Sequence, residues 1–283
     1  MRFWLIPVLI ALAGCSTRPN SVRIDPALAT LVPSDTVLMA GARLDHLRKA
    51  PLYAKIDALL PVGPLAGLDT RDIWELLLTA GGENTAVMAR GRFSAAGLEP
   101  QISVPGATRS AYKGYTLIGT GANALAFLNP TTVIGGRPEA VRAIIDARSN
   151  GSGPPEALAL EIGEIPSEFQ IWAAGSGAAA AIAPRSGNLA NLGTALRLVQ
   201  TFRAGVAVDA GLKFSLNALC RSDQDAGSLS AALGVLLAMG RFNAAPALKS
   251  ALDSFKVEQA GRTVRVNAVL PAATAEQLLA SGH

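Results

Sequence analysis

The chain has 283 residues, of which 50% are hydrophobic and 16% charged, and its formal net charge is +4. The sequence holds 52 Ala and 28 Gly residues, so small side chains make up much of the hydrophobic fraction. A wholly disordered chain is excluded, because it would need low hydrophobicity and a strong net charge. Nucleic-acid binding is not expected either, since neither half of the chain has the concentrated positive charge that phosphate backbones require and only 5% of the residues are aromatic.

The first fifteen residues have the layout of an export signal. Met1 and Arg2 precede an eleven-residue apolar run from Phe3 to Ala13. This run is too short for a permanent membrane-spanning helix, which needs about 20 residues, and it has the proportions of a secretory signal peptide. The segment then closes with Leu12-Ala13-Gly14-Cys15, which resembles the lipobox of bacterial lipoproteins at all four positions.

The lipobox resemblance implies that the protein is exported and anchored to a membrane. It implies cleavage between Gly14 and Cys15, with diacylglycerol attached to the Cys15 thiol, so that residues 1–14 are the signal peptide. Two or three acyl chains would hold the protein stably at a membrane. By the sorting pattern of the family, Ser16 implies an outer-membrane protein that faces the periplasm. The alternative is an ordinary apolar N-terminal helix that ends in a chance cysteine.

The remaining chain divides into a tether and two halves. Residues 15–31 are expected to be the tether, 32–150 a first α+β half and 151–283 a second. A short repeat supports this division, because Val32-Pro-Ser-Asp35 and Ile165-Pro-Ser-Glu168 both precede strand-like runs, 133 residues apart. We interpret the repeat as an ancient duplication, with coincidence as the alternative. The segment from Asn150 to Pro155 has the composition of a linker.

Hydrophobic periodicity predicts the elements of both halves. In the first half we expect strand Thr36–Gly41, two helices broken before Pro51, helix Arg71–Thr79, strands Thr85–Phe93, Tyr115–Gly119, Ala124–Leu128 and Thr131–Gly135, and a helix opened by Pro138. In the second half we expect strand Phe169–Ala174, a helix with Leu189 to Val199 on its apolar stripe, strands Val206–Val208 and Leu212–Cys220, helices around Leu229–Leu237 and from Pro246, hairpin strands Phe255–Gln259 and Thr263–Leu270, and a last helix after Pro271. Strands that alternate apolar and polar residues favour largely antiparallel sheets packed against helices, which is the α+β class.

The cysteine count bears on both folding and chemistry. Cys15 and Cys220 are the two cysteines, so acylation of Cys15 would leave Cys220 without a disulfide partner. Cys220 ends the run Leu212–Cys220, whose even positions are apolar. We therefore expect a thiol on the buried face of a strand rather than a reactive nucleophile.

Motifs for metal and hydrolytic chemistry are missing from the sequence. The histidines are His46 and the terminal His283, which cannot form a zinc cluster with the cysteines, and no G-x-S-x-G elbow occurs. Glu161, Glu164 and Glu168 could be paired carboxylates, but a solvated loop and helix end is the favoured interpretation. The glycines of Gly119-Thr-Gly121 and Gly135-Gly136-Arg137 are expected to form turns rather than a phosphate cradle, and Gly175–Ile182 to pack closely.

These observations leave three hypotheses for function. The first is an envelope lipoprotein without enzymatic activity that binds or scaffolds other envelope components. The second is a periplasmic carrier of lipid or another hydrophobic ligand. The third is an enzyme with an unrecognised site, for which a polar cleft that gathers Arg43, Arg90, Arg92 or Asp45 would be the sign. No cofactor and no metal are expected, and the expected partners are the membrane, an envelope protein or a lipid.

Overall fold

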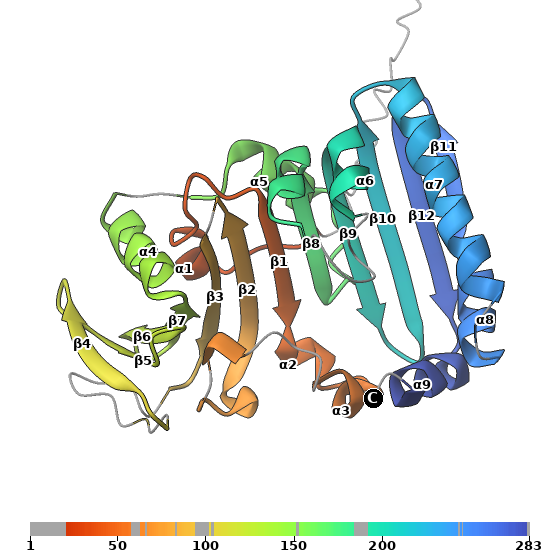
Figure 1. The fold of residues 1–283 in the computed structure, drawn as a ribbon. Helices are drawn as coiled ribbons and strands as arrows, with labels where there is room; N and C mark the ends of the chain where they lie inside the picture. Colours follow the sequence, from red (N-terminus) through yellow and green to blue (C-terminus); the bar gives the residue numbers. More distant parts are fainter. Residues whose placement is uncertain are drawn as a thin grey trace, which may run out of the picture.

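The structure, a computed structural model, describes residues 21–57, 63–65, 67–82, 84–93, 102, 105–150, 153–183, 192–242, 244 and 246–281. Most of them belong to one large sheet or to the helices that cover it (Figure 1). The strands are β1 (Leu38–Arg43), β2 (Ile73–Gly81), β3 (Asn84–Gly91), β4 (Thr108–Tyr112), β5 (Tyr115–Gly119), β6 (Ala124–Asn129), β7 (Thr132–Gly136), β8 (Ile171–Ser176), β9 (Val199–Val208), β10 (Leu212–Cys220), β11 (Lys256–Ala260) and β12 (Thr263–Leu270).

The twelve strands form a single antiparallel sheet in the order β11-β12-β10-β9-β8-β1-β2-β3-β7-β6-β5-β4. Strands that follow one another in sequence are mostly neighbours, as short hairpin connections require. The expected antiparallel α+β class is therefore confirmed.

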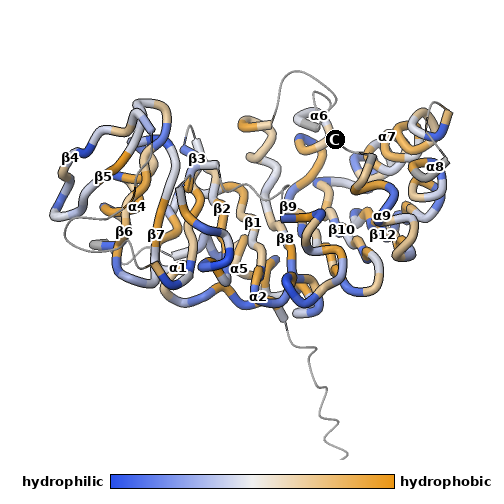
Figure 2. Tube along the Cα trace, turned by 90° about the horizontal axis from the view of Figure 1, so that it is seen from below, coloured by the Kyte–Doolittle hydropathy of each residue, from blue (hydrophilic) through white to orange (hydrophobic). Residues whose placement is uncertain are grey.

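Helices cover both faces of the sheet, and Figure 2 shows α6 and α7 on one side with α1 and α5 on the other. The helices are α1 (Pro26–Ala29), α2 (Leu44–Leu47), α3 (Tyr53–Ile56), α4 (Pro138–Asn150), α5 (Glu156–Gly163), α6 (Leu192–Leu198), α7 (Asp223–Phe242), α8 (Pro246–Asp253) and α9 (Ala272–Ser281). Three short 3-10 turns complete the described elements, namely η2 (Gly63–Leu65), η3 (Thr70–Asp72) and η4 (Gly177–Ala181).

The two faces carry separate hydrophobic cores. Leu28 of α1, Ile144 of α4 and Leu158 of α5 pack on one face, in a cluster that includes Met39 of β1. On the other face, α2, α3, α8 and α9 pack around Ala42 of β1. A third cluster on this second face joins α6 and α7 to the ends of β9, β10 and β12. The sheet is thus buried from both sides over much of its width.

The residues of the two expected halves meet at the centre of the sheet. Residues 32–150 supply β1 to β7, and residues 151–283 supply β8 to β12. The strands that follow the two Pro-Ser motifs, β1 and β8, pair directly, with Ala40 opposite Ala173. These two alanines also correspond to each other in the 133-residue repeat. The duplication itself stays a hypothesis.

One predicted element has the wrong secondary structure. The expected helix Arg71–Thr79 is instead η3 followed by strand β2. Ile73, Leu76 and Leu77 are all buried, and they belong to clusters on opposite faces of the sheet. A central strand covered on both sides loses its alternation, so its apolar run cannot be distinguished from a buried helix by periodicity.

Other differences lie at the sheet edge and at element ends. Strand β4 and helix α5 were not predicted; β4 is almost wholly exposed and α5 follows the expected linker directly. Val199 begins β9 instead of ending a helix, which makes β9 much longer than Val206–Val208. By contrast, β5, β10 and β12 have the predicted bounds. Leu189, expected on the apolar stripe of a helix, lies outside the described residues.

Candidate functional site

An apolar pocket lies between the sheet and the helices η4, α6 and α7, and its volume is about 450 Å³. Its floor comes from strands in the middle of the sheet and its cover from the helices. Among the described lining residues, Thr85 alone has a polar side chain. The lining is Leu38, Leu78, Ala80, Thr85, Val199, Phe202, Leu216, Ala218 and Val264 from the sheet, and Ala179, Ile182, Ala183, Ala195, Leu196, Leu229 and Leu233 from η4, α6, α7 and the residues after η4.

Small side chains keep this pocket open. Ala80 and Ala218 stand on the floor, while Ala179 and Ala195 stand on the helices above it. A larger side chain at these positions would fill the space that a close-packed core normally lacks. The volume is within the range of small-molecule sites, which are concave and mostly apolar. The geometry therefore suits a hydrophobic ligand and offers it few polar contacts.

The Ala-rich segment Gly175–Ile182 was expected to pack closely, and it does so in part. It ends β8 and forms η4, where a side chain at Gly177 would overlap the backbone of Val199. Ala179 of the same turn lines the pocket. The sequence therefore contained a signal for the site, because a run of small apolar residues beside a strand leaves space as well as allowing close approach.

Helices α7 and α8 expose apolar side chains. On α7, Val235 is 57% exposed, Leu236 53%, Met239 63% and Phe242 88%, and Leu248 of α8 is 42% exposed. A contiguous exposed apolar surface in a globular protein commonly marks an interaction site. Thus α7 lines the pocket with Leu229 and Leu233 and exposes further apolar side chains toward its C-terminal end.

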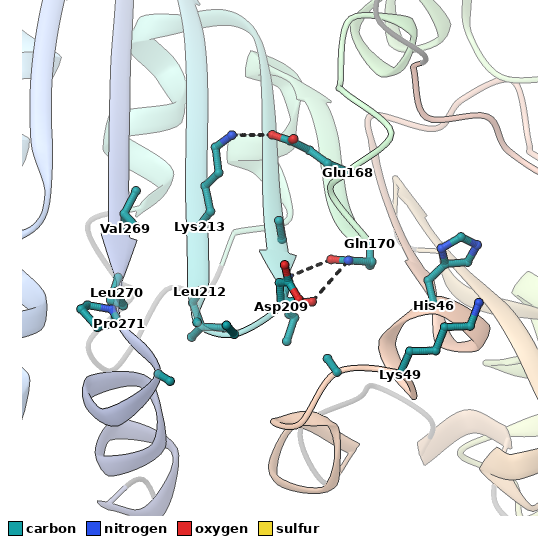
Figure 3. Close-up of a pocket in the computed structure, with 16 residues that line it drawn as sticks. His46, Lys49, Glu168, Gln170, Asp209, Leu212, Lys213, Val269, Leu270 and Pro271 are labelled. Atoms are coloured by element: carbon teal, nitrogen blue, oxygen red, sulfur yellow. Dashed lines mark hydrogen bonds and ion pairs between the residues drawn. The ribbon is translucent and has the colours of Figure 1, made fainter.

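A groove of about 760 Å³, lined by both polar and apolar residues, lies at the other end of β9 and β10. His46, Lys49, Glu168, Gln170, Asp209 and Lys213 are its polar lining residues (Figure 3). Gln170 and the backbone of Val208 bond each other twice, at 2.8 and 3.3 Å, and Lys213 forms an ion pair with Glu168. Three of these six side chains thus have partners within the groove, and the Gln170 contacts hold the start of β8 against the end of β9.

The residues named for an enzyme site are only partly brought together. Arg43 and Asp45 line a separate polar hollow of about 700 Å³, together with His46, Trp74 and Glu75. Burial raises the pKa of the Glu75 carboxyl, and the nearby Asp25 and Asp45 raise it further, while the Asp25 N–H and Arg43 act in the opposite direction. Arg90 and Arg92 are not among the lining residues of this hollow.

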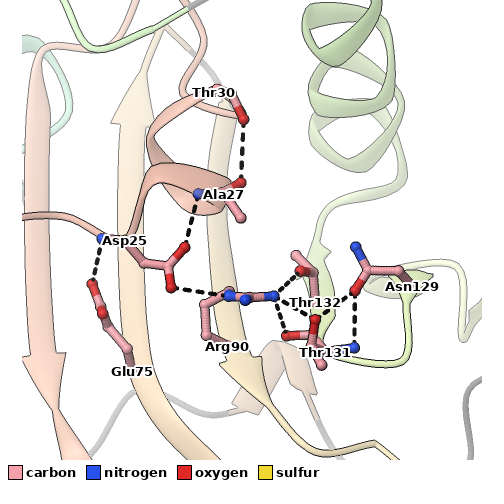
Figure 4. A network of polar contacts seen from close by, with 8 residues as sticks. All are labelled: Asp25, Ala27, Thr30, Glu75, Arg90, Asn129, Thr131 and Thr132. Carbon is pink, nitrogen blue, oxygen red and sulfur yellow. Dashed lines mark hydrogen bonds and ion pairs between the residues drawn. The ribbon is translucent and has the colours of Figure 1, made fainter.

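Arg90 instead holds the N-terminal segment against the sheet (Figure 4). Its Nε donates to Asp25 Oδ2 at 3.1 Å, and its Nη1 donates to the Thr131 carbonyl and to both the Thr131 and Thr132 hydroxyls. Asp25 also caps α1 by accepting from the Ala27 N–H at 2.8 Å. Because Nε and Nη1 of Arg90 both bind structural groups, Arg90 is a positioning residue for residues 21–30.

The three glutamates do not form a carboxylate pair. Glu161 on α5 accepts from Thr201 at 2.6 Å and Arg203 at 2.7 Å, and its side chain is only 15% exposed. The expectation of a solvated loop is therefore wrong for Glu161, which joins α5 to β9. Glu168 pairs with Lys213, and Glu164 caps the end of α5.

Cys220 is fully buried at the end of β10, as its alternating strand predicts. Burial raises the pKa of its thiol, and the nearby Asp225 adds to this effect. Of the glycines expected in turns, only Gly121 lies in one, since Gly119 is the last residue of strand β5 and Gly135 and Gly136 belong to strand β7. Gly121 has φ +61° in the β5–β6 turn, and Gly135 and Gly136 end β7 before α4.

The proposed lipid-attachment residue Cys15 and the terminal His283 lie outside the described residues. Within the described ranges, no three His, Cys, Asp or Glu residues are grouped as a metal site would require. No helix in those ranges combines the length and hydrophobicity needed to cross a bilayer.

Comparison with known proteins supports the fold alone. No family model and no curated protein matches the sequence. Among solved structures, crystal form I of TP0453, a bacterial envelope protein of uncertain role, superposes with a TM-score of 0.53 and 9% identity over 92% of this chain and 98% of that one. Crystal form III of TP0453 gives a TM-score of 0.47 and 10% identity over 92% and 99%. The chain is thus similar in fold to TP0453 across nearly its whole length.

Proposed function

We propose that this protein is an exported envelope lipoprotein, anchored through Cys15, that binds a hydrophobic ligand between the sheet and the helices α6 and α7. The observation that carries the ligand proposal is the apolar pocket of about 450 Å³. An acyl chain suits such a pocket because it gains free energy from leaving water and needs no polar partner. This favours the carrier hypothesis over chemistry at a polar site.

The anchor proposal rests on the lipobox resemblance and agrees with how the folded body begins. Ser21 forms a bridge with Pro166, and the Val22 N–H donates to the Ile165 carbonyl at 2.8 Å. Five residues lie between Cys15 and Ser21, and the six residue steps reach about 20 Å when extended. An acylated Cys15 would therefore hold the body close to its membrane. The outer membrane, facing the periplasm, is the proposed location.

Ligand binding can be tested with a fluorescent fatty acid and displacement by palmitate. We expect the purified protein to bind the probe, and Ala195→Phe or Ala218→Leu to weaken binding at least tenfold by filling the pocket. Ala232→Phe is the matched control, because Ala232 is an exposed α7 residue outside the pocket lining. Equal binding by the filled variants and the control would refute the ligand proposal.

The anchor needs a separate experiment. Mass spectrometry of the membrane-extracted protein should show an N-terminus at Cys15 that carries acyl chains. Cys15→Ser should release the protein from the membrane fraction. An unmodified N-terminus at Met1, or membrane retention by Cys15→Ser, would refute the anchor while leaving the pocket untouched.

A second candidate function is scaffolding, and the exposed apolar surface of α7 favours it. A protein partner that covers Met239 and Phe242 would remove this surface from water. A photo-crosslinker at position 242 should then give a discrete protein adduct in whole cells. The same crosslinker at Ala204, a position in the middle of β9, is the control, and equal adducts from both positions would count against scaffolding.

A further inference from the structure

The β4–β5 hairpin and α4 present a group of cations at the end of the sheet opposite to α7 and α8 (Figure 1). Lys113 occupies the hairpin turn, where φ +46° at Lys113 and +82° at Gly114 direct the chain back on itself. Arg142 and Arg148 are exposed on α4. We call Lys113, Arg142 and Arg148, with the two tyrosines beside them, the cationic ridge.

Two tyrosines hold the cations of the ridge in place. Tyr112 and Tyr115 face each other across the hairpin and pack against the core below α4. The Arg142 guanidinium lies 5.6 Å from the centre of the Tyr112 ring, and the Arg148 guanidinium 5.8 Å from that of Tyr115. Arg148 also donates to the Tyr115 hydroxyl at 2.5 Å. Such cation–π contacts limit the freedom of the side chains without neutralising their charge.

The charge of the ridge is only partly balanced. Asp146 accepts from Tyr112 and forms an ion pair with Lys113 at 2.7 Å. Among the described residues, neither Arg142 nor Arg148 forms an ion pair with a carboxylate. Residues 108–150 contain five Lys and Arg against two Asp and Glu, whereas residues 151–283 contain ten of each. The positive surplus of the folded chain is therefore concentrated at this end of the sheet.

We propose that the cationic ridge docks on the phosphate groups of an anionic phospholipid surface. Guanidinium groups bind phosphate in a two-pronged geometry, and tyrosine is favoured at the boundary between lipid and water because its ring is apolar and its hydroxyl polar. The ridge is a short projecting edge of three cations, which suits a bilayer surface better than the long groove that a nucleic-acid strand needs. This contact is independent of the apolar pocket, and it would orient a protein that is also tethered by its N-terminus.

The test uses the chain from residue 15 with Cys15→Ser, which keeps every described element and carries no acyl group. Its sedimentation is measured with vesicles of phosphatidylcholine alone and with 30% phosphatidylglycerol added. We expect binding to the anionic vesicles to be at least tenfold tighter and to be lost at high salt. Arg142→Gln with Arg148→Gln should weaken it roughly 25-fold, about fivefold for each cation removed.

Matched variants distinguish the effect of the cationic ridge on vesicle binding from the effects of net charge and of misfolding. Arg262→Gln with Arg265→Gln removes the same charge from exposed positions on the β11–β12 hairpin and should change binding less than threefold. Arg142→Lys with Arg148→Lys should retain most of the binding, and Asp146→Asn should strengthen it. Equal loss in both Gln pairs, no preference for anionic vesicles, or capture of polyglutamate but not of vesicles would overturn the proposal. Ala195→Phe, which fills the pocket, should leave vesicle binding unchanged. Failure of the ligand proposal can therefore be distinguished from failure of the membrane-docking proposal.

Discussion

Trp172 of β8 lies directly over Gly41 of β1, the residue opposite it in the central strand pair of the sheet. A Cβ atom at Gly41 would overlap the indole ring of Trp172. On its other side Trp172 pairs with Gly205 of β9, whose backbone is covered by the ring of Phe169. The Trp172 side chain is 3% exposed. The Trp172 ring thus covers the backbone at Gly41, which has no side chain of its own. This contact lies where the two expected halves of the chain join.

Gly41→Val should destabilise the fold. The added side chain must displace Trp172 from a packed core, and such overpacking typically costs about 1–3 kcal/mol. Denaturant unfolding would measure the loss. Gly234→Ala is the control, because no atom lies near a Cβ there and Gly234 is inside helix α7. This change should stabilise the protein by about 0.5–1 kcal/mol. Full stability in Gly41→Val would contradict the role given to the pair.

The accuracy of the sequence-based predictions follows how each strand is covered. Leu212–Cys220 and Thr263–Leu270 alternate because one face packs against helices and the other is wetter, so their bounds could be predicted. Strand β2 has no such alternation, and β4 has almost no buried residues. Neither strand was predicted, and the physical reason is the same for both. Apolar and polar residues alternate along a strand only where one face is buried and the other is exposed.

The pocket could not be predicted because its walls come from distant parts of the sequence. Leu38 and Val264 both line it, yet more than 200 residues separate them. Their meeting depends on strand order, which local patterns do not specify. Individual residues were predictable nevertheless. Cys220 is buried as its strand required, whereas Glu161 is partly buried because Arg203 on a distant strand binds it.

Arg90→Ala should loosen the N-terminal segment from the sheet. The change removes the partner of Asp25, which is only 22% exposed, and leaves its carboxylate poorly compensated. We expect a loss of about 2 kcal/mol and faster hydrogen exchange across residues 21–30. Arg71→Ala is the matched control, since the Arg71–Asp69 ion pair is largely exposed, and it should leave the unfolding midpoint unchanged. Unchanged exchange in Arg90→Ala would contradict the positioning role.

Glu75→Gln should raise stability at neutral pH. Burial raises the pKa of Glu75 above its ordinary value of 4.5, so the folded state holds the proton more tightly than the unfolded state. The charged form therefore reduces stability at pH values above the raised pKa, and the reduction disappears as the pH falls below 4.5. The amide avoids that cost and can still accept from the Asp25 N–H.

Thermal unfolding from pH 4 to pH 8 would test this. The difference in Tm between Glu75→Gln and the parent should grow as the pH rises and vanish at the acid end. Glu276→Gln is the control, because Glu276 is exposed on α9 and its carboxylate stays in contact with water. A Tm advantage of Glu75→Gln that is constant with pH, or largest in acid, would show that desolvation of the carboxylate is not the cause.

Cys220 should resist thiol reagents while the protein is folded. Its side chain is fully buried. Burial raises the pKa of the thiol, and the nearby Asp225 raises it further, so little thiolate is formed near pH 7. In the Cys15→Ser protein, where Cys220 is the remaining cysteine, a disulfide reagent should react within seconds in guanidinium and only at the rate of unfolding in buffer. An added Ala231→Cys, exposed on α7, should react at once in the folded state and serves as the control. Rapid labelling of Cys220 in the folded protein, at a rate whose pH dependence has its midpoint below the ordinary thiol pKa, would instead identify a reactive nucleophile. An enzymatic role would then have to be considered again.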